Sequence, residues 1–285
     1  YEALATPSNG PHSESKELGS FMFKISILLA TYNWPEALRF CLESLETQTD
    51  RNFEIIIADD GSKPETATLI HAMMERSKHS IQHLWQEDQG FRKTLILNQA
   101  IQAAQGEYLI FLDGDCIVQP DFVKRHRQLA KSQMMVTGSR VLLSESLTQK
   151  ILGWPQWNFA AFKSNLISYR LNGGINKFWP IVLKFGPGAW RIYQKFVWRR
   201  IKGCNMACWK EDALAIGGFD ESMTGWGHED ADFVFRLQHS GVRRQSGAWS
   251  TEVFHLFHRI SDQSKAAENA KRVREKIMAK AGIGV

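Results

Sequence analysis

The sequence contains no long apolar stretch. No uncharged apolar run reaches the roughly 18 residues that a membrane-spanning helix needs, and the first residues lack a basic segment followed by an apolar one. We therefore expect a protein that is neither integral to a membrane nor secreted by a standard signal. Cysteine is also scarce. The four cysteines show neither zinc-type spacing nor the density of a disulfide framework, which favours reduced thiols in the cytoplasm.

The glycine-rich turn of dinucleotide-binding enzymes is missing too. Such enzymes place Gly-x-Gly-x-x-Gly after their first strand, whereas residues 31–35, which follow the first apolar run here, contain no glycine. A dinucleotide-dependent dehydrogenase is therefore excluded. The 44% hydrophobic and 23% charged shares are ordinary for globular proteins, which argues against a disordered or fibrous chain. With 285 residues, the chain can fold as one large domain or as two.

Acidic residues are almost absent from one segment. Between Arg140 and Gly203, eleven Lys and Arg side chains accompany a single acid, Glu145, so the net charge of +5 conceals a basic segment within an acidic remainder. The same segment holds five of the ten tryptophans: Trp154, Trp157, Trp179, Trp190 and Trp198. This composition is typical of a membrane surface or a polyanion site, or of an acceptor-side subdomain whose tryptophans are mostly core.

The remaining sequence alternates between short apolar runs and amphipathic stretches. This βαβ order predicts an α/β fold with a parallel sheet covered by helices on both faces. Residues 1–22 lack periodicity and suggest a flexible extension or a cloning remnant, and residues 149–202 suggest a loop-rich or helical insertion. Strands are predicted at 25–30, 53–58, 81–85, 109–113 and 134–138, and helices at 34–47, 64–77, 93–104, 120–132, 229–240 and 265–280.

Two carboxylates follow the apolar run of residues 109–112. Asp113 and Asp115 should therefore lie outside the carboxyl end of a strand, where nucleotides bind in open α/β sheets. Carboxylate oxygens suit a divalent cation that carries phosphate. The pair suggests a phosphate–metal site, although Asp-x-Asp at a strand end is also a common solvated turn.

Two further acidic pairs accompany the first. Asp59 and Asp60 close the second apolar run, and Glu229 and Asp230 follow a Gly-Trp-Gly turn at a predicted helix start. Each pair also has a structural explanation, because Asp-Asp-Gly is a good turn sequence and acids at a helix start interact favourably with the helix dipole. Their joint occurrence in one βαβ chain favours a common crevice.

Two histidines near the C-terminus are candidate metal ligands. The apolar residues of segment 253–259 predict a strand, and the three-residue spacing then puts His255 and His258 on opposite faces. At most one of them should reach the site. A lone histidine among apolar residues is more often a hydrogen-bonded core group.

Taken in order, these motifs resemble inverting family-2 glycosyltransferases with the GT-A fold. The resemblance covers about residues 24–260. It is nearest to bacterial enzymes related to the catalytic domains of chondroitin polymerase and galactosyltransferases, which carry a Trp-Gly-x-Glu-Asp block. The ordered series of motifs is far more specific than any single motif in it. The series comprises residues 29–33, 58–62, 90–93 with Asn98, 113–115, 203–207, 217–221 and 225–230.

The resemblance implies a GT-A fold, which is a Rossmann-like, nucleotide-binding mixed sheet flanked by helices. The basic, tryptophan-rich segment is then an insertion at about residues 140–203, on the acceptor or membrane side. The transferase domain is expected at residues 23–262, after the extension at 1–22 and before a C-terminal helix at 263–285.

The resemblance also implies roles for individual residues. The nucleotide and donor are expected at Thr31, Tyr32, Asp59, Asp60, Arg92, Lys93 and Asp113. The metal, Mn²⁺ or Mg²⁺, is expected at Asp115 with Asp113 and His255, or with His258 as the alternative to His255. The catalytic pair is expected to be Asp230, as the base, and Glu229, which also contacts the acceptor or donor sugar, while Trp226 stacks on a sugar face.

The implied activity is metal-dependent transfer of a sugar from a UDP-sugar to a hydroxyl group of a glycan acceptor. The metal neutralises charge on the leaving diphosphate, and a carboxylate base accelerates attack by about 10² to 10⁴. A direct displacement inverts the anomeric carbon, so an α-linked donor gives a β-linked product. We expect a glycan or lipid-linked acceptor of bacterial surface polysaccharide synthesis, and no nucleic-acid partner.

The residues also allow two alternative functions, and the basic segment suggests a membrane contact. A phosphatase of the haloacid dehalogenase type also ends a strand in Asp-x-Asp, but normally the first strand, whereas three precede it here. A non-enzymatic polyanion or nucleic-acid binder leaves the acidic pairs unexplained. The basic segment instead suggests contact with the cytoplasmic face of an anionic inner membrane, where each basic residue contributes about 1 kcal/mol.

Overall fold

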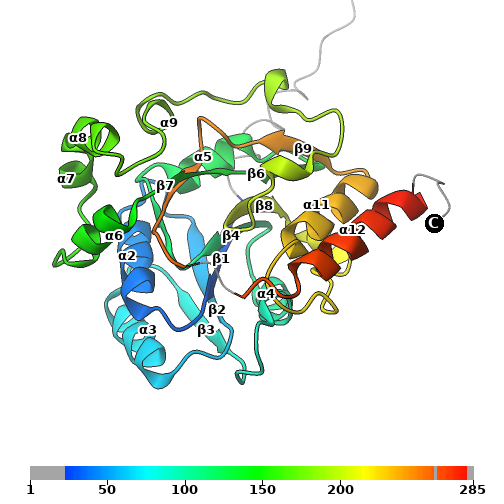
Figure 1. Ribbon diagram of the computed structural model, residues 1–285, viewed down its shortest axis with the longest axis horizontal. Coiled ribbons are helices and arrows are strands. Elements are labelled where there is room, and N and C mark those ends of the chain that lie inside the picture. Colours follow the sequence, from blue (N-terminus) through cyan, green and yellow to red (C-terminus); the bar gives the residue numbers. More distant parts are fainter. Residues whose placement is uncertain (1–22, 260–261, 281–285) are drawn as a thin grey trace, which may run out of the picture.

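The computed structural model describes residues 23–259 and 262–280 (Figure 1). Its described residues form a central sheet of seven strands. The four strands nearest the N-terminus are parallel, as the βαβ pattern predicts, whereas β8 is antiparallel to both its neighbours, so the sheet is mixed. The order is β3 (Ile81–Trp85), β2 (Phe53–Asp59), β1 (Ile25–Thr31), β4 (Tyr108–Asp113), β8 (Asn205–Trp209), β6 (Met134–Thr137) and β9 (Arg243–Ser246).

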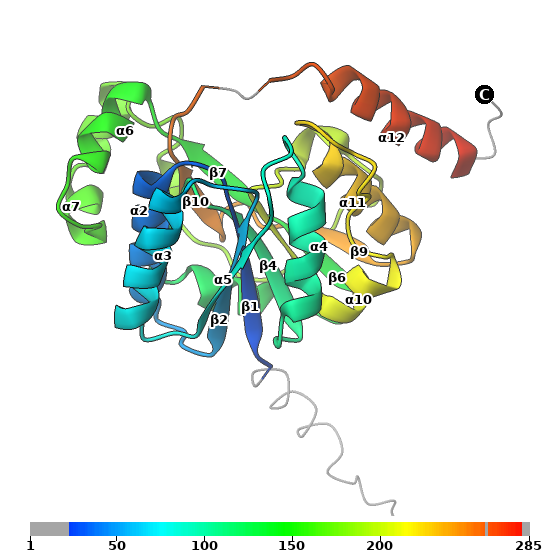
Figure 2. The ribbon, with the colours of Figure 1, turned by 90° about the horizontal axis from the view of Figure 1, so that it is seen from below.

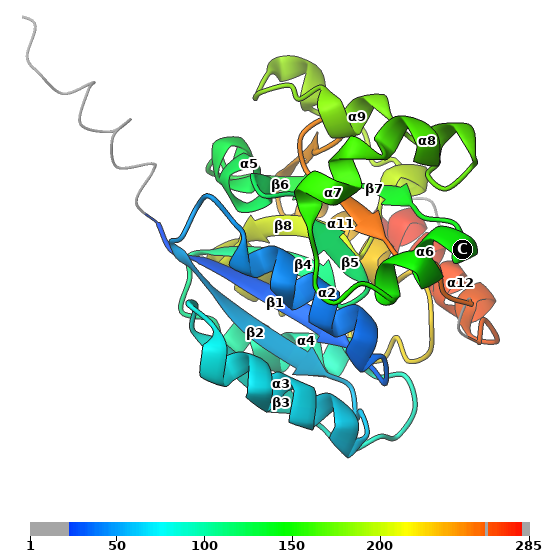
Figure 3. The same ribbon diagram turned by 90° about the vertical axis from the view of Figure 1, so that its left-hand side faces the viewer.

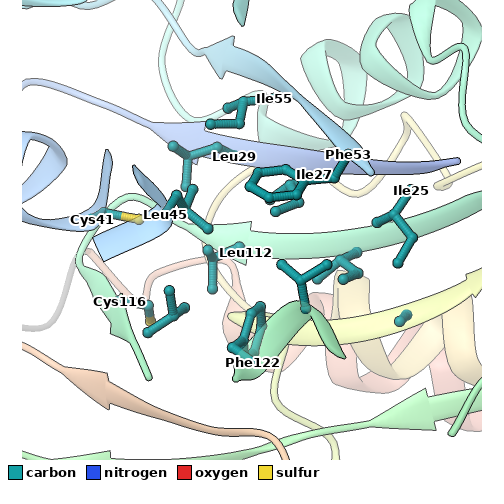
Figure 4. Close-up of a cluster of buried hydrophobic side chains, with 14 of the residues drawn as sticks. Ile25, Ile27, Leu29, Cys41, Leu45, Phe53, Ile55, Leu112, Cys116 and Phe122 are labelled. Carbon is teal, nitrogen blue, oxygen red and sulfur yellow. The ribbon is translucent and has the colours of Figure 1, made fainter. Parts of the chain in front are cut away.

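Alternate side chains of the central strands supply two separate cores. Ile25, Ile27 and Leu29 of β1 pack on one face with residues of α2, α3 and α5 (Figure 4). Leu28 and Ala30 pack on the other face with residues of α4, α10 and α11. Every residue of β1 and β2 is buried, as expected for strands covered on both faces.

Helices cover both faces of the sheet. Figure 2 shows α2 and α3 on one side and α4 and α11 on the other. Both α2 and α3 begin at a proline, whose fixed φ and missing N–H suit the first helical turn. The helices are α2 (Pro35–Glu46), α3 (Pro64–Arg76), α4 (Lys93–Ala103), α5 (Phe122–Leu129), α10 (Lys210–Ala215) and α11 (Glu229–His239).

A second, three-stranded sheet places the two candidate histidines. It consists of β5 (Cys116–Val118), β10 (Glu252–His255) and β7 (Ser139–Leu142), with β10 in the middle. The antiparallel register pairs His255 with Cys116, directly after Asp115. The backbone N–H of Leu256 then donates to the Asp115 carbonyl at 3.0 Å. The prediction of opposite faces was therefore wrong, because the strand ends at His255, before His258.

The basic segment folds as short helices around a third core. These are α6 (Glu145–Leu152), α7 (Phe159–Ser164), α8 (Leu166–Leu171), α9 (Trp179–Val182), η1 (Ala189–Arg191) and η2 (Trp198–Arg200). Phe162 of α7 and Trp157 are buried against Phe254 of β10. Trp179 and Trp190 are instead 60% and 61% exposed. The tryptophans thus divide between core and surface.

The C-terminal helix α12 (Ala266–Lys280) packs against α11 (Figure 1). The Lys276 ammonium bridges Asp220 and Asp232, at 2.6 Å from each. This helix lies within the predicted span 263–285. Residues 1–22, predicted as an extension, and residues 281–285 lie outside the described residues. Across the described helices, none combines the length and apolar character required to cross a membrane.

Candidate active site

A cavity of about 980 Å³ lies at the carboxyl ends of β1, β2 and β4. This is the usual position of ligands in open α/β sheets. The second sheet and the start of α11 contribute the remaining walls. The predicted residues that line the cavity are Thr31, Tyr32, Asp60, Lys93, Asp113, Asp115, Trp226, Glu229, Asp230, His255 and His258.

Two predicted donor-binding residues, Asp59 and Arg92, do not line the cavity. The Asp59 side chain is fully buried; one oxygen accepts a backbone N–H bond from the following turn and the other lies 3.1 Å from His83 Nε2. The Arg92 guanidinium donates to a backbone carbonyl of its own loop at 2.7 Å. Asp59 fixes the turn after β2, and the Arg92 backbone N–H donates to Asp60. Their donor-binding roles stay predictions.

One end of the cavity suits a nucleoside. The Asp60 carboxylate accepts the Arg92 N–H at 2.9 Å, and burial raises the pKa of Asp60 above its ordinary value. Tyr32 is 52% exposed and donates its hydroxyl to Asp88 at 2.9 Å. An exposed aromatic ring beside a fixed carboxylate can stack on a base and accept hydrogen bonds from hydroxyl groups.

Lys93 and Asp113 form an ion pair inside the cavity. Nζ and Oδ1 lie 2.5 Å apart, with the side chains 15% and 26% exposed. Burial by itself lowers the pKa of Lys93, but the carboxylates of Asp113 and Glu229 outweigh it and raise that pKa above its ordinary value. Lys93 therefore stays charged and neutralises part of the acidic charge.

Asp115 and both candidate histidines converge. Asp115 Oδ2 lies 3.1 Å from Nε2 of His258 and 3.7 Å from Nε2 of His255. Each Nδ1 lies within 2.9 Å of a backbone carbonyl, that of Leu256 or Arg259. Because Nδ1 must carry the proton to donate there, the lone pair of the neutral ring is on Nε2, next to Asp115.

This arrangement fits a divalent cation. The three ligand atoms of Asp115, His255 and His258 lie within 4.8 Å of one another. Two imidazole nitrogens favour a transition metal such as Mn²⁺ over Mg²⁺, which prefers oxygen ligands. Without a cation, the hydrogen bond to Asp115 raises the pKa of His258 to about 9, so a cation must displace a proton at neutral pH. Asp113 is a weaker candidate ligand because it is bonded to Lys93.

Glu229 and Asp230, at the start of α11, have contrasting environments. One Asp230 oxygen accepts the Gly203 N–H at 2.8 Å and the other accepts the Ala231 N–H at 2.7 Å. Glu229 Oε2 is buried and has no hydrogen-bond partner among the described residues. Burial, reinforced by the Asp230 carboxylate, raises the pKa of Glu229 to about 7. Since buried polar atoms are normally paired, Oε2 marks a position that a ligand can complete.

The turn before α11 depends on unusual backbone angles. Gly227 has φ of 110° and His228 has φ of 71°, in the left-handed region that glycine adopts without strain. The Trp198 indole N–H donates to Nδ1 of His228 at 3.2 Å and supports this conformation. The turn presents Trp226 to the cavity, 36% exposed.

Comparison with known proteins identifies the family. Residues 26–201 match the family described as Glycosyl transferase family 2, and residues 189–259 match the one described as N-terminal domain of galactosyltransferase. The chain belongs to glycosyl transferase family 2. This match confirms the resemblance inferred from the ordered motifs. It argues against the two alternative functions, the phosphatase and the polyanion binder.

Several relatives of this family-2 protein are curated. Chondroitin synthase of Escherichia coli is 28% identical over 76% of the chain and 32% of its own length. Hyaluronan synthase of Pasteurella multocida is 27% identical over 75% of the chain and 22% of its length. Validoxylamine A glucosyltransferase of Streptomyces hygroscopicus subsp. jinggangensis is 25% identical over 81% and 56%. The chain therefore spans less than two thirds of each of these relatives.

Solved structures confirm the GT-A fold of this family-2 protein. S. aureus TarS superposes with a TM-score of 0.61 at 14% identity, covering 90% of the chain and 40% of TarS. GalNAc-T7, solved with UDP, GalNAc and Mn²⁺, gives 0.63 at 15% identity and covers 89% of the chain and 48% of that protein.

Other cavity residues were missed from the sequence. Arg140 and Lys202 line the cavity, as does Trp198. All three belong to the basic, tryptophan-rich segment, so the composition pointed to their neighbourhood. It could not distinguish these side chains from the segment's other cations and tryptophans, because the segment has no periodicity that shows which residues face inward.

Proposed function

We propose that this protein is a metal-dependent, inverting glycosyltransferase that moves a sugar from a UDP-sugar to a hydroxyl group of a glycan acceptor. One observation carries the proposal: the fixed carboxylate of Asp230 and the Asp115–His255–His258 set line the same cavity. The similarity to a structure that contains UDP, GalNAc and Mn²⁺ supports this donor class.

The donor would extend across the cavity from β1 to β10. Tyr32 and Asp60 would bind the base and ribose, with Thr31 beside them. Asp115, His255 and His258 would hold Mn²⁺, which supplies Lewis-acid neutralisation of the charge on the leaving diphosphate. Because Lys93 stays protonated, its ammonium group would offset the negative charge of Asp113 in this region.

Asp230 would take the proton from the acceptor hydroxyl. Its two backbone N–H bonds orient the carboxylate, and lone pairs remain for the hydroxyl. The unpaired Oε2 of Glu229 would bind a sugar hydroxyl, and Trp226 would stack on a sugar face. One base and a direct displacement give inversion, so an α-linked donor yields a β-linked product.

The acceptor is proposed to be a glycan or lipid-linked glycan of bacterial surface polysaccharide synthesis, used in the cytoplasm at the inner membrane. The relatives named chondroitin synthase and hyaluronan synthase support the glycan class. The exposed face of α7 and α8 supports the membrane contact. Lys163, Ile167, Arg170 and Leu171 follow helical spacing on this face, and Ile167 and Leu171 are 66% and 80% exposed.

Further exposed aromatic side chains lie in the same basic segment. Figures 1 and 3 show α9 on the same side of the molecule as α7 and α8. Trp179 of α9 and Trp190 of η1 are both more than half exposed, and Phe185 between them is 47% exposed. Exposed tryptophans beside cations suit the headgroup region of an anionic bilayer.

Transfer assays with a panel of UDP-sugars and Mn²⁺ test the proposed reaction, with the product anomer assigned by NMR. We expect a β-linked product from an α-linked donor. Asp230→Asn should leave UDP binding with Mn²⁺ nearly unchanged and lower turnover by about 10² to 10⁴, whereas Glu211→Gln on exposed α10 should not. An α-linked product, or full turnover by Asp230→Asn, contradicts the proposal.

A further inference from the structure

Two cations in the cavity lack an acidic partner. Arg140 of β7 and Lys202 both line the cavity, and neither forms an ion pair with any described residue. Among the described residues, the Arg140 guanidinium has one hydrogen-bond partner, the Cys204 sulfur at 3.9 Å. Half-buried cations are normally paired, because leaving water without a counter-charge costs free energy.

A third cation lies directly behind them. The Lys177 ammonium donates to Ser139 Oγ at 3.0 Å and to the Arg140 carbonyl at 2.9 Å. Burial lowers the pKa of Lys177, and repulsion from Arg140 and Lys202 lowers it further. The nearby acid Glu252, which raises the pKa of Lys177, already binds Lys184 at 3.3 Å. Arg140 and Lys202 therefore form a positive wall of the cavity without a paired acid among the described residues, and Lys177 lies behind it.

This positive wall lies on the sugar side of the cavity. Lys202 immediately precedes Gly203, whose N–H holds the proposed base Asp230. Arg140 lies on β7, the strand paired with β10, which ends at His255. The nucleoside end at Tyr32 and Asp60 is formed by other elements, β1 and the end of β2. An anion between Arg140 and Lys202 would sit where the transferred sugar meets its acceptor.

We infer that Arg140 and Lys202 form a subsite for an oxyanion, a carboxylate or a phosphate, carried by the glycan substrate. The inference rests on the proposed transferase function, whose substrate class it narrows to an acidic glycan. The oxyanion has two sources, the C6 carboxylate of a uronic acid donor or an acidic group of the acceptor. In both cases the guanidinium and ammonium groups donate charge-assisted hydrogen bonds to it.

Sulfate is the probe for the subsite. Sodium sulfate is titrated, at constant ionic strength, into protein saturated with UDP and Mn²⁺, and binding is followed by calorimetry. We expect Arg140→Gln/Lys202→Gln to weaken sulfate binding at least roughly tenfold. Lys78→Gln/Lys280→Gln removes two exposed cations elsewhere and should bind sulfate like the wild type. Equal sulfate affinity in both variants, or sulfate binding that UDP abolishes, overturns the inference.

Two donors that differ only at C6 then separate the sources. A preference for UDP-glucuronic acid over UDP-glucose of about tenfold, lost in Arg140→Gln/Lys202→Gln, places the oxyanion on the donor. Equal binding of the two donors, with sulfate binding still dependent on these cations, places it on the acceptor. If the wild type fails to bind UDP, the proposed function fails, and the same sulfate titration on the nucleotide-free protein judges the subsite separately.

Discussion

Glu229 and Asp230 are neighbours in the chain, yet their carboxyl groups differ in hydrogen bonding. Asp230 is held by two backbone N–H groups, whereas Glu229 Oε2 is buried without a partner among the described residues. The pKa of Glu229 is about 7 in the ligand-free folded protein, against an ordinary value of 4.5. The folded protein therefore keeps a proton on Glu229 at pH values where the unfolded chain has already released it. This difference makes the pair a measurable determinant of stability.

Replacing Glu229 should change how stability depends on pH. Between pH of about 4.5 and about 7 the folded protein binds one proton more at Glu229 than the unfolded chain, so stability falls as pH rises through this window. Glu229→Gln removes this contribution. In thermal melts without metal, it should gain up to about 3 kcal/mol relative to the wild type by pH of about 8, and nothing below pH of about 4.5.

A matched variant controls for the charge change. Glu75→Gln on exposed α3 should keep the pH dependence of the wild type. If Glu229→Gln and Glu75→Gln gave the same profile, Glu229 would have an ordinary pKa, and the effect assigned to its burial would be wrong.

Candidate site residues could be named from the sequence, but not all of their contacts. Residue type and order were enough to name Asp115, Asp230 and both histidines as candidates. The sequence could not show that both oxygens of Asp59 already have partners in the fold. One of those partners, His83, is 24 residues away on β3. It also could not show that the strand ends at His255, since the apolar pattern continues to Phe257.

At the scale of elements, long periodic segments were predictable and short reversed strands were not. The parallel strands β1, β2 and β4 and the helices between them follow from alternating apolar runs. β5, β7 and β9 have three or four residues each, too few to show a period. β8 is antiparallel, and a strand's direction leaves no mark on its sequence. Of these unpredicted strands, β7 lines the cavity with Arg140 and pairs with β10, which ends at His255.

The helix α12 should help to position Glu229 and Asp230, because it contacts the turn at residues 224–228 that precedes them. Buried Asn269 donates to the carbonyls of Thr224, at 3.2 Å, and Gly227, at 3.0 Å. Asn269→Ala leaves both carbonyls unpaired, so we expect a loss of about 1–3 kcal/mol in the free energy of unfolding. Turnover should fall, whereas UDP binding with Mn²⁺ should persist because Asp115 and the histidines lie on other elements.

Chemical denaturation, calorimetry and transfer assays measure these three effects. Lys271→Ala, on the exposed side of the same helix, should change none of them. Asn269→Ala turnover equal to that of Lys271→Ala, after correction for the folded fraction, would show that α12 does not support the turn.

At the scale of the whole molecule, the cations of the basic segment lie in two separate places. Arg140 and Lys202 line the cavity, with Lys177 behind them, whereas Lys163 and Arg170 lie on the exposed face of α7 and α8. The sequence shows only their sum. The fold separates the proposed substrate-binding cations from the exposed face proposed to contact an anionic membrane.

Vesicle sedimentation tests the exposed face. At low salt, the wild type should sediment with vesicles that contain anionic lipid and not with neutral ones. Lys163→Gln/Arg170→Gln should weaken this binding at least roughly tenfold, since each cation contributes about 1 kcal/mol. Lys78→Gln/Lys280→Gln, matched in charge, should bind normally. Sedimentation that is independent of lipid charge would exclude electrostatic membrane contact.

The central claim is that the cavity binds a nucleoside diphosphate through a divalent cation held by Asp115, His255 and His258. Its most direct test is calorimetric titration of UDP into the purified, folded protein with and without Mn²⁺, for the wild type and Asp115→Ala. We predict binding by the wild type that requires Mn²⁺ and is strongly weakened in Asp115→Ala. UDP binding of equal affinity without Mn²⁺, or no binding in either condition, would contradict the account.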